Sequence, residues 1–142
     1  MTEEIPESLF QKYHVALVKA LGEDAQKIFV KLGRELGSKI TNKEKVSLKD
    51  LETELENYLQ NDLKLGEKVK VNIENSVLNV EVQGCKVCPA NEILRSEGLR
   101  GVCFLPGILM GAVKSVEEVK KATMAGSQKF KVGHCKMQLK LE

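Results

Sequence analysis

The residues with the clearest chemistry are four cysteines, three of which fall within the stretch 84–111. Two residues separate Cys85 from Cys88, and fourteen residues separate Cys88 from Cys103. Cys135 lies near the C-terminus. Two-residue spacing lets both thiolates reach one cation from a tight turn, and four sulfur ligands suit tetrahedral zinc. The sequence therefore predicts a zinc site, provided that the fold brings Cys103 and Cys135 to the Cys85/Cys88 pair. An iron–sulfur cluster, which we favour less, would use the same residues.

Other interpretations of the cysteines stay open. Buried cysteines are common as small hydrophobic residues, and for Cys103 this interpretation weighs as much as a ligand role. A redox pair of Cys85 and Cys88 is a second possibility, because a helix starting at Pro89 would lower the pKa of thiols at its N-terminus. Nearby Asp or Glu carboxylates are further candidate ligands, and His134 is a candidate replacement for Cys135.

Length and composition indicate one globular domain over residues 1–142, of 15.8 kDa, with 42% hydrophobic and 30% charged residues. No apolar run reaches the length of a membrane span, and the acidic start lacks the pattern of a secretory signal. We therefore expect a cytoplasmic protein, in which cysteines serve as thiols or metal ligands rather than in disulfides. The net charge of +2, with 4% aromatic residues and no Trp, gives no support for nucleic-acid binding.

The first part of the chain, residues 1–65, is predicted to be mainly helical. Apolar residues recur at helical spacing over residues 7–21, from about 23 to 40, and from 48 to 63. The expected apolar stripes are Leu9 or Phe10, Tyr13, Leu17 and Leu21 in the first helix; Ala25, Ile28, Phe29, Leu32, Leu36 and Ile40 in the second; and Leu48, Leu51, Leu55, Tyr58 or Leu59 and Leu63 in the third. We expect His14 to be a partly exposed helix residue.

Two features refine these helices. Ser47, followed three residues later by Asp50, has the pattern of a helix N-cap. Gly33 and Gly37 lie one turn apart, and each costs the second helix up to about 1 kcal/mol relative to alanine. Close approach of another helix or of a ligand would compensate, and helix packing is the simpler explanation.

Residues 66–142 are predicted to form a sheet with a cysteine-bearing helical insertion. Alternating apolar residues over 69–73 and 78–82, joined by Asn75-Ser76, predict an antiparallel hairpin. Pro89 and Pro106 each favour the start of a short helix. A strand over about 119–124 and another over 135–141 follow, and alternation turns Cys135 toward the core and His134 to the other face. The expected fold is α+β. The N-terminal helices are expected to pack on an antiparallel sheet of about four strands, with a helix inserted between the two hairpins.

This order of features resembles the 4-vinyl reductase-type, or hydrocarbon-binding, domain from about residue 9 to the end. The likeness rests on three short patterns: the Gly33/Gly37 pair, the run CFLPGILMG that starts at Cys103, and Gly133 with Cys135. The resemblance implies a fold shared with haem–nitric-oxide-binding domains and TRAPP subunits. It further implies binding of a small apolar molecule, a cysteine-ligated zinc that includes Cys103 and Cys135, and a homodimer formed through the helices. Family members commonly carry another cysteine before the last strand; this chain has none there, and Cys85 or Cys88 is a candidate substitute.

We therefore expect a regulatory or sensor domain that binds a small apolar ligand and holds a structural metal, rather than an enzyme. The expected pocket lining is Phe29, Leu32, Gly33, Leu36, Phe104, Gly107, Ile108 and Leu109. The alternatives are a thiol redox enzyme that uses Cys85/Cys88 and a structural dimerisation module without a ligand. No Ser/His/Asp set, pair of catalytic carboxylates or phosphate-binding loop is evident.

Overall fold

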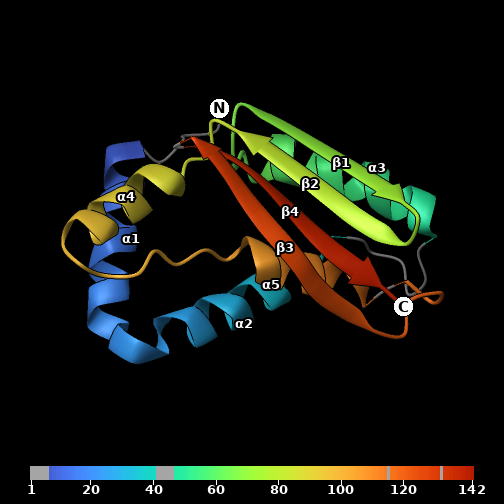
Figure 1. Ribbon diagram of the computed structural model, residues 1–142, viewed down its shortest axis with the longest axis horizontal. Coiled ribbons are helices and arrows are strands. Elements are labelled where there is room, and N and C mark those ends of the chain that lie inside the picture. Colours follow the sequence, from blue (N-terminus) through green and yellow to red (C-terminus); the bar gives the residue numbers. More distant parts are fainter. Residues whose placement is uncertain (1–6, 41–46, 115, 132) are drawn as a thin grey trace.

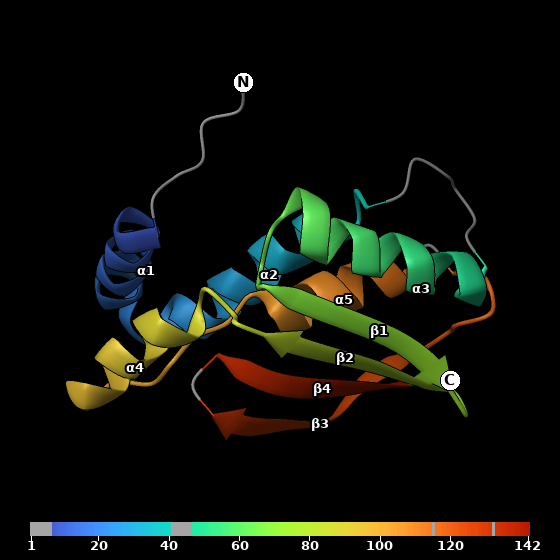
Figure 2. The same ribbon diagram turned by 90° about the horizontal axis from the view of Figure 1, so that it is seen from above.

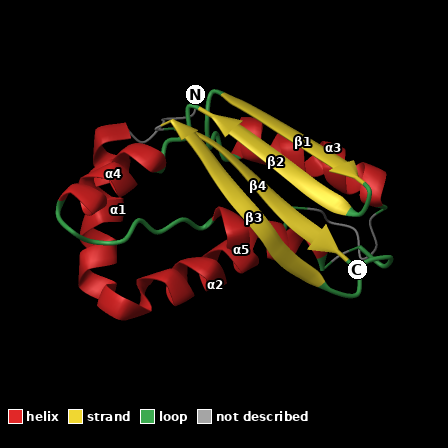
Figure 3. Cartoon of the chain, viewed as in Figure 1, coloured by secondary structure: helices red, strands yellow, loops and turns green. Residues whose placement is uncertain are grey.

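In the computed structural model, residues 7–40, 47–114, 116–131 and 133–142 are described, so the acidic start of the chain lies outside them. The elements follow the order α1 (Glu7–Leu21), η1 (Gly22–Asp24), α2 (Ala25–Gly37), α3 (Leu48–Asn57), η2 (Tyr58–Asp62), β1 (Lys68–Glu74), β2 (Val77–Gln83), α4 (Cys88–Ser96), α5 (Leu105–Val113), β3 (Ala122–Lys131) and β4 (His134–Leu141). Helices come first and two hairpins follow, with α4 and α5 between the hairpins (Figure 3). The predicted α+β fold is confirmed.

The four strands form one antiparallel sheet in the order β1-β2-β4-β3. Asn75 and Ser76 connect β1 to β2 with φ angles of 52° and 60°, the positive values that a tight two-residue hairpin turn requires. Helices α3 and α5 lie behind the sheet in Figure 1, and none of the described helices covers its front face. The core lies between these helices and the sheet, where Leu55, Leu78 and Leu139 are fully buried.

Helix α3 begins as the sequence predicts, because the Ser47 hydroxyl accepts a hydrogen bond from Asp50 N at 3.2 Å. The helix also seals one edge of the sheet. Three side chains at successive turns of α3 and η2 accept hydrogen bonds from outward N–H groups of β1, with Glu52 bound to Ile73, Glu56 to Val71 and Gln60 to Val69 at 2.9–3.1 Å. An open strand edge invites pairing with another chain, and these bonds close the β1 edge.

Helices α2 and α5 cross in direct backbone contact. A methyl group added at Gly33 would lie 2.8 Å from Ile108 N, and one at Gly37 would lie 2.9 Å from the Ile108 carbonyl carbon. The reverse holds on α5, where Cβ atoms at Gly107 and Gly111 would meet the backbone of Val30 and Arg34. Helix packing is therefore the structural reason for the paired glycines.

Most of the predicted apolar stripe of α1 is wrong, although Phe10 and Leu21 are half-buried against core residues. Leu9, Tyr13 and Leu17 are 46%, 70% and 41% exposed, whereas His14 and Val18 are buried. His14 was expected to be partly exposed but is only 4% exposed, because α1 turns its His14 face toward α4 and α2. Figure 2 shows α1 and α4 side by side, beyond the end of the sheet.

Part of the predicted stripe of α2 is also wrong. Its buried residues are Ala25, Phe29, Gly33 and Gly37, one turn apart, whereas Leu32 and Leu36 are 49% and 38% exposed. The contact with α5 selects the glycine face, since larger side chains could not fit there. Strand β3 begins at Ala122, slightly later than predicted, and continues to Lys131. Within the described residues, no helix is both long and apolar enough to cross a bilayer.

Candidate metal centre

The four cysteines lie around one end of the sheet. Cys85 follows the end of β2, and its N–H donates to the carbonyl of Gly133, just before β4, at 2.8 Å. Cys88 is the first residue of α4, and Cys103 stands two residues before α5. Cys135, near the start of β4, is paired with Val82 of β2. Cys85 belongs to the main core, and the other three pack against it.

Cys85, Cys88 and Cys103 interact with one another. A hydrogen bond to Cys88 raises the pKa of the Cys85 thiol, and burial and the charge of Cys88 act in the same direction. Burial of the Cys103 thiol raises its pKa to about 11, with a smaller contribution from the charge of Cys88. Without a cation, Cys85 and Cys103 are therefore protonated at neutral pH.

Two of the sulfur atoms also accept backbone hydrogen bonds in the same local geometry. Cys85 accepts from the N–H of Val87, and Cys103 Sγ accepts from Leu105 N at 3.4 Å. In both cases the donor is two residues after the cysteine, and the bond lowers the thiol pKa. Such bonds favour the charged thiolate, which is the form that binds a metal.

The alternation predicted for β4 is confirmed. Cys135 lies on the face of Met137 and Leu139, which are buried, and His134 lies on the opposite face. There, His134 Nε2 is 2.9 Å from Glu81 Oε1, and this hydrogen bond lowers the pKa of Glu81. His134 therefore belongs to the open polar face of the sheet and not to the cysteines.

Cys85, Cys88 and Cys103 are neighbours, but the cysteines are not arranged as a finished metal site. Among the described residues, no group of three or more His, Cys, Asp or Glu side chains has a spacing that would already hold a metal ion. The close pair is Cys85 and Cys88, whereas Cys103 acts on both through its charge interactions. A tetrahedral site would need Cys103 and Cys135 to approach this pair.

The predicted pocket residues do not line one common cavity. Gly33, Phe104, Gly107 and Ile108 meet at the α2–α5 crossing, where backbone atoms occupy the space next to both glycines. Ile108 and Leu109 are fully buried in the main core. Phe29 belongs to a smaller cluster with Val18, Ala25, Leu94 and Val102. Leu32 and Leu36 point outward from α2 and do not join either group.

A cleft of about 550 Å³ opens elsewhere, at the corner between α1 and α2. Val18, Ala25 and Val102 form its buried apolar floor, and Leu99 and Arg100 lie on its rim. Its remaining lining residues are Lys19, Gly22, Glu23 and Gln26. The size and the apolar floor are typical of small-molecule sites.

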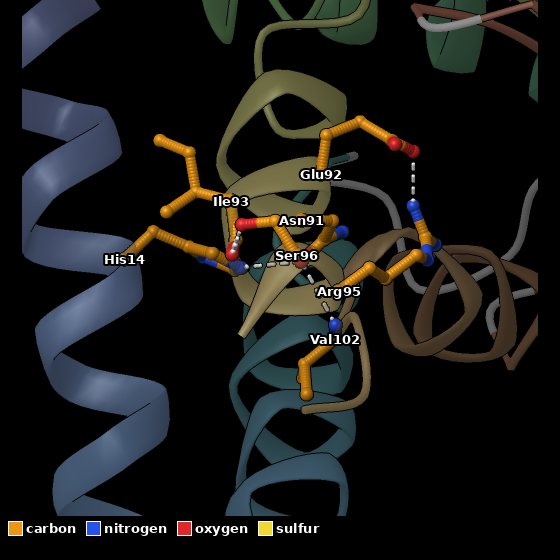
Figure 4. Close-up of polar contacts among 7 residues, drawn as sticks. All are labelled: His14, Asn91, Glu92, Ile93, Arg95, Ser96 and Val102. Atoms are coloured by element: carbon orange, nitrogen blue, oxygen red, sulfur yellow. Dashed lines mark hydrogen bonds and ion pairs between the residues drawn. The ribbon is translucent and has the colours of Figure 1, made fainter. Parts of the chain in front are cut away.

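Sequence reasoning missed a buried polar connection beside the cysteines. His14 Nε2 is 3.0 Å from Asn91 Oδ1, and the same oxygen accepts from Val102 N at 2.9 Å (Figure 4). Asn91, in the middle of short helix α4, was the available indication, because asparagine is unfavourable in a helix interior unless its amide has another use.

The chain belongs to the MJ0207 family, whose model matches residues 15–141. No curated protein matches the chain.

Proposed function

We propose that this member of the MJ0207 family holds a structural zinc ion through its cysteine thiolates, within a domain that binds a small apolar ligand. The main support is that Cys85 and Cys88 are hydrogen-bonded and that Cys103 is close enough to interact with them through charge. The sulfur atoms of Cys85 and Cys103 each also accept a hydrogen bond from a backbone N–H. The donor set fits zinc, which prefers thiolate ligands. A bound zinc ion lowers the pKa of a coordinating thiol, so that even a buried thiol loses its proton. Cys85, Cys88, Cys103 and Cys135 would hold the ion, which would tie β2, α4, the start of α5 and β4 together.

The alternative of a redox enzyme has weaker support. A thioredoxin-like pair is expected in a parallel βαβ unit, but every strand pairing in the described sheet is antiparallel. The raised pKa of Cys85 is also opposite to what a reactive cysteine needs. Both observations favour a ligand role for the pair.

Cobalt(II) titration of reduced, metal-free protein tests the metal site. The wild-type protein should develop thiolate-to-cobalt charge-transfer absorption, which zinc then abolishes by displacement. Cys85→Ser and Cys88→Ser should each weaken cobalt binding at least roughly tenfold, because each removes a ligand. Met124→Ser, at an exposed position on β3, is the control and should bind as the wild type does. Absence of thiolate absorption in the wild type would refute the metal site.

The apolar ligand has a separate candidate location. The cleft at the α1–α2 corner supports it better than the α2–α5 crossing, because backbone contacts fill the crossing next to its glycines. An apolar fluorescent dye should bind saturably, and Leu99→Glu at the cleft rim should weaken this binding while Met124→Glu does not. A dye affinity that Leu99→Glu leaves unchanged would argue against the cleft.

A homodimer through the helices is the third part of the proposal. Leu9, Tyr13 and Leu17 form an exposed apolar row along α1, and Leu32 and Leu36 form another on α2. Apolar rows of this kind are typical of surfaces that another protein covers. A structural dimerisation module without a ligand would use the same surface, and the dye experiment separates the two.

A further inference from the structure

The buried connection His14–Asn91–Val102 joins α1 to α4 and to the segment that follows α4, which are distant from α1 in sequence (Figure 4). His14 and Asn91 are 4% and 5% exposed, so each needs an internal partner. The Val102 N–H must donate, which identifies the Asn91 atom that it meets as the amide oxygen. His14 Nε2 meets the same oxygen and therefore carries a proton. One oxygen thus accepts from α1 and from the segment after α4.

The connection lies next to two candidate metal ligands in the sequence. Asn91 lies one turn after Cys88 in α4, and its own N–H donates to Val87 O at 3.1 Å. Val102 immediately precedes Cys103. The Asn91 side chain therefore links the turn of α4 that begins at Cys88 to the residue next to Cys103.

The segment before Cys103 makes few hydrogen bonds, although Val102 is buried in the cluster that includes Leu94 and Cys103 packs against the main core. Over residues 100–103, the bond from Val102 N to Asn91 is the one hydrogen bond to a backbone N–H or C=O within the described part of the chain. The backbone of Gly101 also packs closely against the Asn91 side chain, since a methyl group added at Gly101 would lie 3.0 Å from Asn91 Cβ. Asn91 therefore provides the polar attachment between α4 and the residue before Cys103, beside the apolar packing of Val102.

His14 in turn holds Asn91. The imidazole packs edge-on against Phe29 of α2, with ring centroids 5.1 Å apart, and lies 6.3 Å from Phe10. These contacts fix the ring, and the ring fixes the amide through its hydrogen bond. A polar residue that orients a metal ligand from outside the coordination shell is a common requirement of metal sites.

We propose that Asn91, oriented by His14, is a positioning residue that sets the Cys103 thiol against Cys85 and Cys88, so that affinity for a thiophilic divalent cation depends on it. This inference rests on the proposed metal site. Asn91 touches no metal ligand side chain in the proposal and acts through the backbone of Val102 and through α4.

Cobalt(II) affinity of reduced, metal-free protein is the test. Asn91→Leu keeps the shape of the side chain but removes the acceptor oxygen, and its affinity should fall about 10- to 100-fold, the range typical of lost supporting groups in metal sites. Asn91→Asp keeps an acceptor for both donors and should bind within about threefold of the wild type. Leu94→Ala, in the same helix and fully buried, is the control for general loosening of α4.

The outcomes are distinct. If the wild type binds cobalt and Asn91→Leu binds it with the same affinity, the inference is overturned and the proposed metal site is intact. The same conclusion follows if Leu94→Ala loses as much cobalt affinity as Asn91→Leu does. Absence of cobalt binding in the wild type overturns both. If Asn91→Leu does not fold, the milder pair His14→Leu and His14→Gln replaces it, and only His14→Leu should lose affinity, because glutamine retains a donor for Asn91.

Discussion

The protonation of single thiols governs what the cysteine cluster does at a given pH. Cys85 and Cys103 each combine a backbone N–H donor, which favours the thiolate, with burial, which opposes it. In the metal-free protein, the hydrogen bond to Cys88 together with burial keeps Cys85 protonated, and burial keeps Cys103 protonated. A divalent cation would reverse the balance, and the protons would be released when it binds.

The pKa of Cys103 predicts a loss of stability at alkaline pH. Its value in the folded protein, about 11, exceeds the ordinary 9.0, so the native state holds this proton more tightly than the unfolded state does. The contribution is complete below about pH 9 and is lost as the pH rises toward 11. At 1.36 kcal/mol per pH unit, the loss is on the order of 2 kcal/mol.

Urea unfolding of metal-free protein at a series of alkaline pH values measures this loss. Cys103→Ala should show a smaller decline than the wild type over the same range, because it lacks the buried thiol that ionises, whereas Cys85 is present in both proteins. Equal declines in the two proteins would contradict a buried, protonated Cys103.

Residue types and spacing predicted the proximity of Cys85 and Cys88 and the inward face of Cys135, but they misplaced His14. The two-residue spacing and the alternation of β4 are local facts, and local facts suffice to bring Cys85 beside Cys88 and to turn Cys135 inward. The partner of His14 is Asn91, 77 residues away. The spacing of apolar residues in α1 cannot reveal a hydrogen-bond partner in α4.

At the scale of elements, the α2–α5 crossing is the contact most sensitive to a single methyl group. Gly33→Ala should destabilise the protein, because the new Cβ would meet the backbone of Phe104 and Ile108, which cannot turn aside. Overpacking costs typically about 1–3 kcal/mol and outweighs the gain of up to ~1 kcal/mol in helix propensity. Gly107→Ala should behave in the same way against Val30.

Chemical denaturation of both variants measures this cost. The control is Gly126→Ala on β3, where an added Cβ meets nothing within 4 Å and the free energy of unfolding should change by less than about 0.5 kcal/mol. A stabilised Gly33→Ala would contradict the close crossing.

Element boundaries followed from the sequence more closely than element faces did. The helix over residues 7–21, the Ser47 cap and the Asn75-Ser76 turn were all predicted correctly, since each depends on neighbouring residues. The buried face of α2 could not be predicted from hydrophobicity. Its glycines are buried because α5 approaches them, while Leu32 and Leu36, the stronger apolar residues, remain outside.

At the scale of the whole molecule, exposed apolar residues lie on two neighbouring helices, in one row on α1 and another on α2. We expect light scattering at micromolar concentration to give twice the chain mass of 15.8 kDa. Leu17→Lys should shift the protein toward the monomer, because it places a charge in the exposed row of α1. Met124→Lys, at a similarly exposed position on β3, should leave the mass unchanged. A monomer mass for the wild type across the accessible range would reject the dimer.

The metal content of the purified protein tests the central claim most directly. Protein prepared without a tag under reducing conditions should carry about one zinc per chain by native mass spectrometry, because one tetrahedral ion takes up to four sulfur ligands. Its cysteines should resist alkylation until a chelator is added. Zinc-free protein whose four thiols react freely, and whose melting temperature does not respond to added zinc, would contradict the account.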